Sequence, residues 1–146
     1  MIKIFLDTNI FIRFLTKDNQ EKFIECECLF HLINQGKIKP YTSNIVFLEI
    51  FFILHKLYKF PLNQVTMVLE KISKIRNITI IEKTRTAQAL ALLKKYRIKF
   101  ADCLIATQIP PKAELVTYDV DFRKIRDLKT IYPEEVKINA QVRPIH

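Results

Sequence analysis

The sequence is almost without glycine, since Gly36 is the only one among 146 residues. Nucleotide-binding P-loops need Gly-x-x-x-x-Gly-Lys, and dinucleotide-binding folds need Gly-x-Gly-x-x-Gly, because only glycine lets the backbone close on phosphate groups. A chain with one glycine can form neither pattern. Any phosphate chemistry must therefore depend on side chains and metal ions.

Cysteine is also scarce, with three residues in the chain. Three cysteines cannot all pair, and nothing indicates export, so free thiols are expected. Cys26 and Cys28 lie in a segment with helical periodicity, where residues two positions apart do not face one another. Because no second Cys or His pair completes a zinc site, core packing is the favoured role for these thiols.

Long apolar runs are missing as well. The longest strongly apolar run, residues 45–54, contains Glu49 and has half of the roughly 20 residues that a membrane span needs. Residues 1–7 lack the apolar region and the cleavage site of a signal peptide. The expectation is a cytoplasmic protein that does not bind membranes.

Positive charge is abundant. Lys and Arg number 24 against 15 Asp and Glu, which gives a formal net charge of +9. An excess of this size favours an anionic partner, most often a nucleic acid or an acidic protein. Hydrophobic residues make up 49% of the chain, enough to build the core of one domain.

Short β-rich runs alternate with segments of helical periodicity. This alternation predicts an α/β fold with a parallel sheet of about five strands between two layers of helices, although the order of the strands cannot be read from the sequence. The domain is expected to span residues 1–133, and residues 134–146 to form an irregular tail of unknown role. The expected strands are 2–6, 37–41, 78–81, 114–117 and 130–132, and the expected helices are 8–15 with Thr8 or Asn9 as the cap, 18–36, 44–58, 61–76, 84–97 and 99–109.

Four acidic residues stand where charge is hard to justify structurally. Asp7 and Asp119 each follow an expected strand, and ligands of open α/β sheets bind at the carboxyl ends of strands. Glu49 and Asp102 lie inside apolar helical segments. Singly, each has a structural alternative: a helix cap or turn for Asp7, a turn for Asp119, a solvent-facing helix side for Glu49, and a favourable helix dipole for Asp102.

Taken together, these acids indicate a metal site. Four carboxylates near one edge of a sheet would repel each other unless they were protonated or bridged by cations. Oxygen-only ligands suit Mg²⁺ or Mn²⁺, which can lower the pKa of a bound water and stabilise charge on a transferring phosphoryl group. A basic surface around such a site would hold the phosphate backbone of a nucleic acid.

Four segments of the sequence resemble the motifs of PIN-domain ribonucleases, and most closely the VapC-like toxins of toxin–antitoxin pairs. The resemblance covers about residues 2–132. The segments are Phe-Leu-Asp-Thr-Asn at 5–9, Asn-Ile-Val-Phe-Leu-Glu-Ile at 44–50, Phe-Ala-Asp-Cys-Leu-Ile-Ala at 100–106 and Thr-Tyr-Asp-Val-Asp-Phe at 117–122.

The resemblance implies a PIN-like three-layer fold and an endoribonuclease that uses Mg²⁺ or Mn²⁺. It further implies a homodimer, an RNA substrate and an antitoxin partner that blocks the site. The apolar surplus of the chain, 49%, leaves residues for an interface, and Phe11 and Phe14 in the first helices are candidates. By resemblance, the catalytic and metal-binding acids are Asp7, Glu49, Asp102 and Asp119, with Asp121 as a candidate fifth, and Asn9 and Thr117 support the site by hydrogen bonding.

Other functions are also compatible with the sequence. A housekeeping RNA-processing nuclease and a non-catalytic RNA- or protein-binding module would share the fold, although binding alone gains nothing from four acids facing phosphate. Haloacid-dehalogenase-type phosphatases need a second aspartate two positions after the first, where this chain has Asn9. Triad hydrolysis is disfavoured, because no Gly-x-Ser-x-Gly elbow accompanies the three histidines.

Overall fold

The computed structural model describes residues 1–136, which form a five-stranded parallel sheet with strand order β3-β2-β1-β4-β5. The strands are β1 (Ile2–Leu6), β2 (Ile38–Ser43), β3 (Thr79–Ile81), β4 (Glu114–Val116) and β5 (Thr130–Ile131). The helices are α1 (Thr8–Thr16), α2 (Gln20–Asn34), α3 (Asn44–Phe52), α4 (Leu62–Ser73), α5 (Thr86–Tyr96) and α6 (Phe100–Ala106), with a π-helical segment η1 (Ile53–Leu57) and a 3-10 helix η2 (Val120–Lys124).

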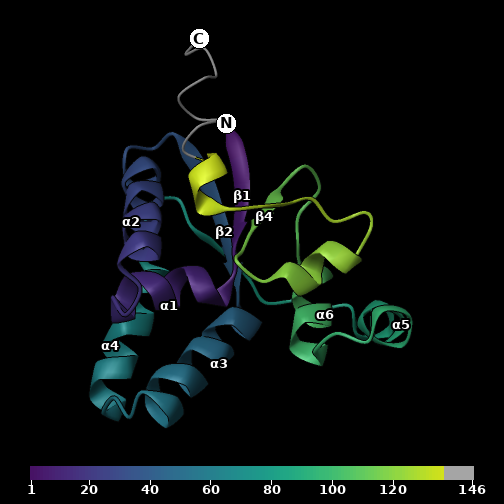
Figure 1. Ribbon diagram of the computed structural model, residues 1–146, viewed down its shortest axis with the longest axis horizontal. Helices are drawn as coiled ribbons and strands as arrows, with labels where there is room; N and C mark the ends of the chain where they lie inside the picture. Colours follow the sequence, from purple (N-terminus) through teal and green to yellow (C-terminus); the bar gives the residue numbers. More distant parts are fainter. Residues whose placement is uncertain (137–146) are drawn as a thin grey trace.

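Helices cover both faces of the sheet. Figure 1 shows α1, α2 and α4 on one side and α5 and α6 on the other, with α3 beyond the ends of the strands. The predicted three-layer α/β fold with about five parallel strands is confirmed.

The central strand explains why an apolar run begins the chain. β1 pairs with β2 on one side and β4 on the other, and Ile4, Phe5 and Leu6 are fully buried. A strand buried on both faces has no need of alternating polar residues. The chain then leaves the sheet at Asp7, whose N–H donates to the carbonyl of Val116 at 3.1 Å.

Several helix boundaries follow the expected local chemistry. Ser43 and Asn19 cap α3 and α2 by accepting hydrogen bonds from the N–H groups of Val46 and Lys22. Arg97 ends α5 in the left-handed conformation. The α1 cap differs from the prediction: Asp7 occupies it, because Thr8 and Asn9 already belong to the helix and turn their side chains to other partners.

Several other bounds differ from the sequence-based expectation, among them the end of α4 at Ser73, three residues before the expected 76. The helix expected to reach residue 58 changes at Ile53 from α to π geometry, and α6 ends at Ala106, three residues before the expected end at Ile109. Residues 133–136 are helical and Val136 is buried, whereas the sequence predicts an irregular tail from Glu134. The rest of that expected tail, 137–146, falls outside the described residues.

The remaining expectations concern thiols and membranes. Cys26 and Cys103 are buried, Cys28 is partly buried, and all three are free thiols. Cys26 packs in the core, as predicted, whereas Cys28 lies outside the core cluster, in contrast to the prediction. Within residues 1–136, no helix is both long and apolar enough to cross a membrane.

Candidate active site

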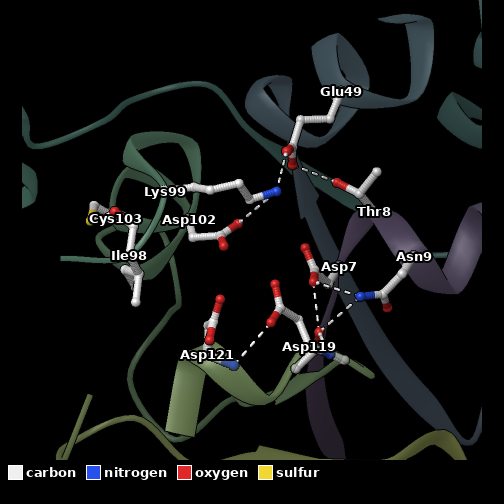
Figure 2. A network of polar contacts seen from close by, with 11 residues as sticks. Asp7, Thr8, Asn9, Glu49, Ile98, Lys99, Asp102, Cys103, Asp119 and Asp121 are labelled. Atoms are coloured by element: carbon white, nitrogen blue, oxygen red, sulfur yellow. Dashed lines mark hydrogen bonds and ion pairs between the residues drawn. The ribbon is translucent and has the colours of Figure 1, made fainter. Parts of the chain in front are cut away.

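The four acids singled out in the sequence lie around one cavity. Its volume is about 290 Å³, and Figure 2 shows their side chains pointing toward a common centre. Asp7 and Asp119 come from the ends of β1 and β4, and Glu49 and Asp102 come from α3 and α6. The carboxyl end of the parallel sheet thus gathers side chains from four separate elements, as open α/β sheets do at ligand sites.

Asp7 is the most firmly held of the four acids. It is 4% exposed, and its Oδ2 accepts hydrogen bonds from the Thr117 hydroxyl at 2.6 Å and from Asn9 Nδ2 at 3.3 Å. Burial raises the pKa of Asp7 to about 6, and the neighbouring charges of Glu49 and Asp119 add to this, while hydrogen bonds from Thr117 and the Thr8 backbone act against it.

Asn9 and Thr117 connect the first strand end to the fourth. Asn9 Nδ2 donates to the Thr117 hydroxyl at 3.2 Å, and Asn9 Oδ1 accepts from the N–H of Tyr118 at 3.2 Å. The Thr117 hydroxyl oxygen also accepts from the N–H of Asp119 at 2.9 Å. Through these contacts the Thr117 hydroxyl bonds both to the Asp7 carboxylate and to the Asp119 backbone.

Glu49 reaches the cavity from α3. Its Oε1 accepts a hydrogen bond from the Thr8 hydroxyl at 2.7 Å, and its side chain is 19% exposed. The buried part of α3 is formed by Val46 and Ile50, and Leu48 faces solvent. Glu49 therefore has a specific polar partner inside an apolar helix, in contrast to a carboxylate that merely faces water.

Asp102 is the least satisfied of the four acids. It is 2% exposed, and its Oδ2 is buried without any hydrogen-bond partner. Burial raises the pKa of Asp102 to about 7; Lys99 opposes this shift, and Asp7, Asp119 and Glu49 add to it. A buried carboxylate oxygen without a partner costs free energy, which a bound cation would recover.

Lys99 also lies at the site, although it was not among the residues predicted from the sequence. Its ammonium is 3.7 Å from Glu49 Oε2 and 3.9 Å from Asp102 Oδ1 (Figure 2). A signal was present in the sequence, because residues three apart at a helix start lie on the same side, and Lys99 precedes Asp102 by three positions. The contact with Glu49 could not be foreseen, since it depends on how α3 and α6 pack.

Asp121 occupies a different position from the other acids. Its N–H donates to Asp119 Oδ1 at 2.9 Å, so the start of η2 fixes the Asp119 side chain. The Asp121 carboxylate pairs with Lys124 at 3.5 Å, is 45% exposed and does not line the cavity. Asp121 thus contacts Asp119 through its backbone N–H, and its role as a candidate fifth ligand stays a prediction.

The donors fit a hard divalent cation. They are carboxylate oxygens, which suit Mg²⁺ or Mn²⁺, and the partnerless Asp102 Oδ2 lies among them. Among residues 1–136, however, no three acidic, histidine or cysteine side chains lie close enough together to hold an ion as they stand. The chemistry of the site therefore suits such a cation, and the side chains would have to rearrange to bind it.

Comparisons with known proteins agree with this fold. The family model for the PIN domain matches residues 4–128. Similar solved structures include the VapBC2 complex of Rickettsia felis bound to a DNA fragment from its promoter, with 23% identity, 90% of this chain and 98% of that chain covered, and a TM-score of 0.62. VapBC-1 of nontypeable Haemophilus influenzae is 24% identical over 91% of this chain and 98% of that chain, with a TM-score of 0.64. A search of curated proteins found no match.

Proposed function

This chain belongs to the PIN domain family, and from that premise we propose that it is an endoribonuclease that uses Mg²⁺ or Mn²⁺ to hydrolyse phosphodiester bonds. The observation that carries the proposal is the convergence of Asp7, Glu49, Asp102 and Asp119 on one cavity in a chain with a net charge of +9. Negative charge at this place would repel RNA unless cations bridge it to phosphate.

Each acid has a role that follows from its surroundings. Asp7 and Asp102 are the most buried and would hold the cation, with Asp119 and Glu49 completing the ligand set. When bound, the cation would lower the pKa of a water molecule and stabilise charge on the phosphoryl group. Thr117 and Asn9 keep Asp7 in place, so less ordering is needed when substrate arrives.

The proposed nuclease activity can be tested by adding and removing the metal. Purified protein should cleave RNA in the presence of Mn²⁺ or Mg²⁺, lose the activity in a chelator, and regain it when excess metal is returned. A copurifying ribonuclease is excluded if the activity follows this protein through two different columns. Cleavage that persists unchanged in the chelator would contradict the metal-dependent reaction.

We further propose that the chain is the toxin of a toxin–antitoxin pair and acts in the cytoplasm. The similar solved structures are VapBC complexes, which supports an antitoxin as the partner. An arginine of that partner would fit four carboxylates, because its planar guanidinium pairs bidentately with carboxylate oxygens. A housekeeping RNA-processing nuclease is the alternative, and it would have no such inhibitor.

Coexpression tests the toxin role. The chain alone should slow growth, and the product of an adjacent short reading frame should bind it and restore growth. If that product neither binds nor inhibits, and the chain alone does not slow growth, the toxin role fails while the nuclease proposal stands.

Apolar surfaces are available for both proposed protein partners, which are the antitoxin and a second copy of this chain in a homodimer. Phe11 and Phe14, expected at an interface, line an apolar cavity of about 370 Å³ with residues of α2 and α4. Phe11 is only 2% exposed, so it could form the floor of a binding groove but not its rim. For the homodimer, α3 offers the outward-facing Leu48 and Phe52, which are 65% and 55% exposed.

A further inference from the structure

Lys99 occupies a position that helix chemistry disfavours. It is the N-cap residue of α6, where Ser, Thr, Asp and Asn are preferred because their side chains accept hydrogen bonds from the first N–H groups. Lys99 makes no such bond. A positive charge at the start of a helix also lies at the unfavourable end of the helix dipole. Local helix stability therefore gives no reason for a lysine here.

The acidic side chains that face Lys99 in the cavity explain a lysine at this position. The Lys99 ammonium lies between carboxylates of two different helices, 3.7 Å from Glu49 Oε2 in α3 and 3.9 Å from Asp102 Oδ1 in α6. The lysine side chain is 64% exposed, whereas those of Glu49 and Asp102 are 19% and 3% exposed. An exposed ammonium on a flexible stem thus lies near two carboxylates that are largely buried.

We propose that Lys99 is a tethered counter-ion of the active site, whose ammonium competes with the divalent cation for Glu49 and Asp102 and thereby sets the metal affinity. The inference rests on the proposed function, because it concerns the same site. In the metal-free protein the ammonium partly offsets the repulsion among four acids. A divalent cation must displace it, and the exposed stem gives the ammonium room to withdraw.

The arrangement of the acids agrees with this competition. In the described part of the chain, no group of three acids is arranged to hold an ion, and the ammonium lies between Glu49 and Asp102 (Figure 2). The two distances exceed those of hydrogen bonds, so Lys99 acts through charge and leaves Asp102 Oδ2 without a partner.

Removing this charge should strengthen metal binding. In Lys99→Gln, Mn²⁺ would meet the full charge of the acids without a competitor. The expected gain in affinity is about three- to ten-fold at low salt, from one unit charge removed a few ångströms away in a partly exposed site. Lys99→Arg keeps the charge and should bind Mn²⁺ as wild type does. The gain should shrink at high salt.

Lys129→Gln is the matched control. Lys129 also pairs with a buried carboxylate, Glu114, at 3.4 Å, and its side chain is 71% exposed. Glu114 begins β4, at the opposite end of the strand from Asp119, so the same loss of charge occurs away from the site. Lys129→Gln should leave Mn²⁺ affinity close to wild type.

The experiment is calorimetric titration of Mn²⁺ into the four purified proteins without RNA, after circular dichroism has shown that each is folded. Tighter binding by Lys99→Gln alone supports the inference. Equal or weaker binding by Lys99→Gln, or the same gain in Lys129→Gln, overturns it and leaves the proposed function intact. If neither wild type nor Lys99→Gln binds Mn²⁺, the metal-dependent function fails and the inference fails with it.

Discussion

The hydroxyl of Thr117 donates a 2.6 Å hydrogen bond to Oδ2 of Asp7, and both residues are almost fully buried. This bond connects the end of β4 to the end of β1. It also favours the charged form of Asp7, because it lowers the pKa of a carboxyl that burial raises to about 6. Thr117 thereby helps to keep Asp7 available as a carboxylate ligand near neutral pH.

Removal of this hydroxyl should change the pH dependence of cleavage. In Thr117→Val, the pKa of Asp7 should rise further, because the bond that lowers it is gone. The acid side of the profile of kcat/KM against pH should then move to higher pH, and activity near pH 6 should fall more than activity at pH 8. Thr66→Val on the exposed face of α4, which loses only a hydroxyl bond to the Leu62 carbonyl, is the control.

Charge at Asp7 should cost the metal-free protein stability. The pKa of Asp7 is about 6 in the folded protein against an ordinary value of 3.8, so the folded state binds more protons between about pH 4 and pH 6. The free energy of unfolding should therefore fall as pH rises through that window. Asp7→Asn removes this contribution, and its stability relative to wild type should be about 2 kcal/mol greater at pH 8 than at pH 4.

Chemical denaturation of both proteins in a chelator at the two pH values measures this difference. The comparison at pH 4 is the internal control, since wild-type Asp7 is then largely protonated in the folded state. A constant difference between the two proteins across this pH range would show that burial does not perturb Asp7.

RNA binding should depend strongly on salt. With a net charge of +9, affinity is expected to rest mainly on phosphate contacts, and each neutralised phosphate releases counterions. The logarithm of the association constant of a catalytically inactive variant should fall linearly with the logarithm of salt concentration. A flat response, measured by fluorescence anisotropy with a labelled RNA, would rule out a mainly electrostatic interaction.

Self-association should depend on the outer face of α3. Leu48 is 65% exposed there, and Leu48→Glu should convert the proposed dimer to a monomer, because a buried unpaired charge is strongly unfavourable. Met67→Glu, on α4 and 58% exposed, is the control and should leave the dimer intact. Sedimentation velocity of the wild type and both variants distinguishes the dimer from the monomer. A wild-type protein that is already monomeric would refute the dimer.

The sequence predicts most of the local structure because the decisive signals are local. Residues 2–6 form the strand that their apolar run indicates, and Asn19 and Ser43 cap the helices that follow them. The strand order could not be predicted, because it depends on pairings such as Leu6 with Val116, which lie far apart in the chain. The 3-10 helix at residues 120–124 was not predicted, because Asp119 and Asp121 suit a turn equally well.

In the candidate site, too, local features could be predicted from the sequence and features that depend on packing could not. The sequence picks out Asp7, Glu49, Asp102 and Asp119 by their unfavourable positions, and the fold places them around one cavity. It missed Lys99, whose contact with Glu49 depends on how α3 and α6 pack, and it could not show that the Asp121 carboxylate turns to Lys124. The metal-binding roles of the acids stay predictions until they are measured.

The most direct test compares RNA cleavage by Asp102→Asn and Asp127→Asn in Mn²⁺. Both variants lose one negative charge, but only Asp102 lines the active-site cavity, while Asp127 lines a separate cavity beside Glu114 and Lys129. We expect Asp102→Asn to stay folded and to lose cleavage at least about a hundred-fold, because loss of an outer-shell partner already costs about 10- to 100-fold and a direct ligand matters more, while Asp127→Asn should cleave like wild type. Undiminished cleavage by folded Asp102→Asn would contradict the assignment of this cavity as the active site.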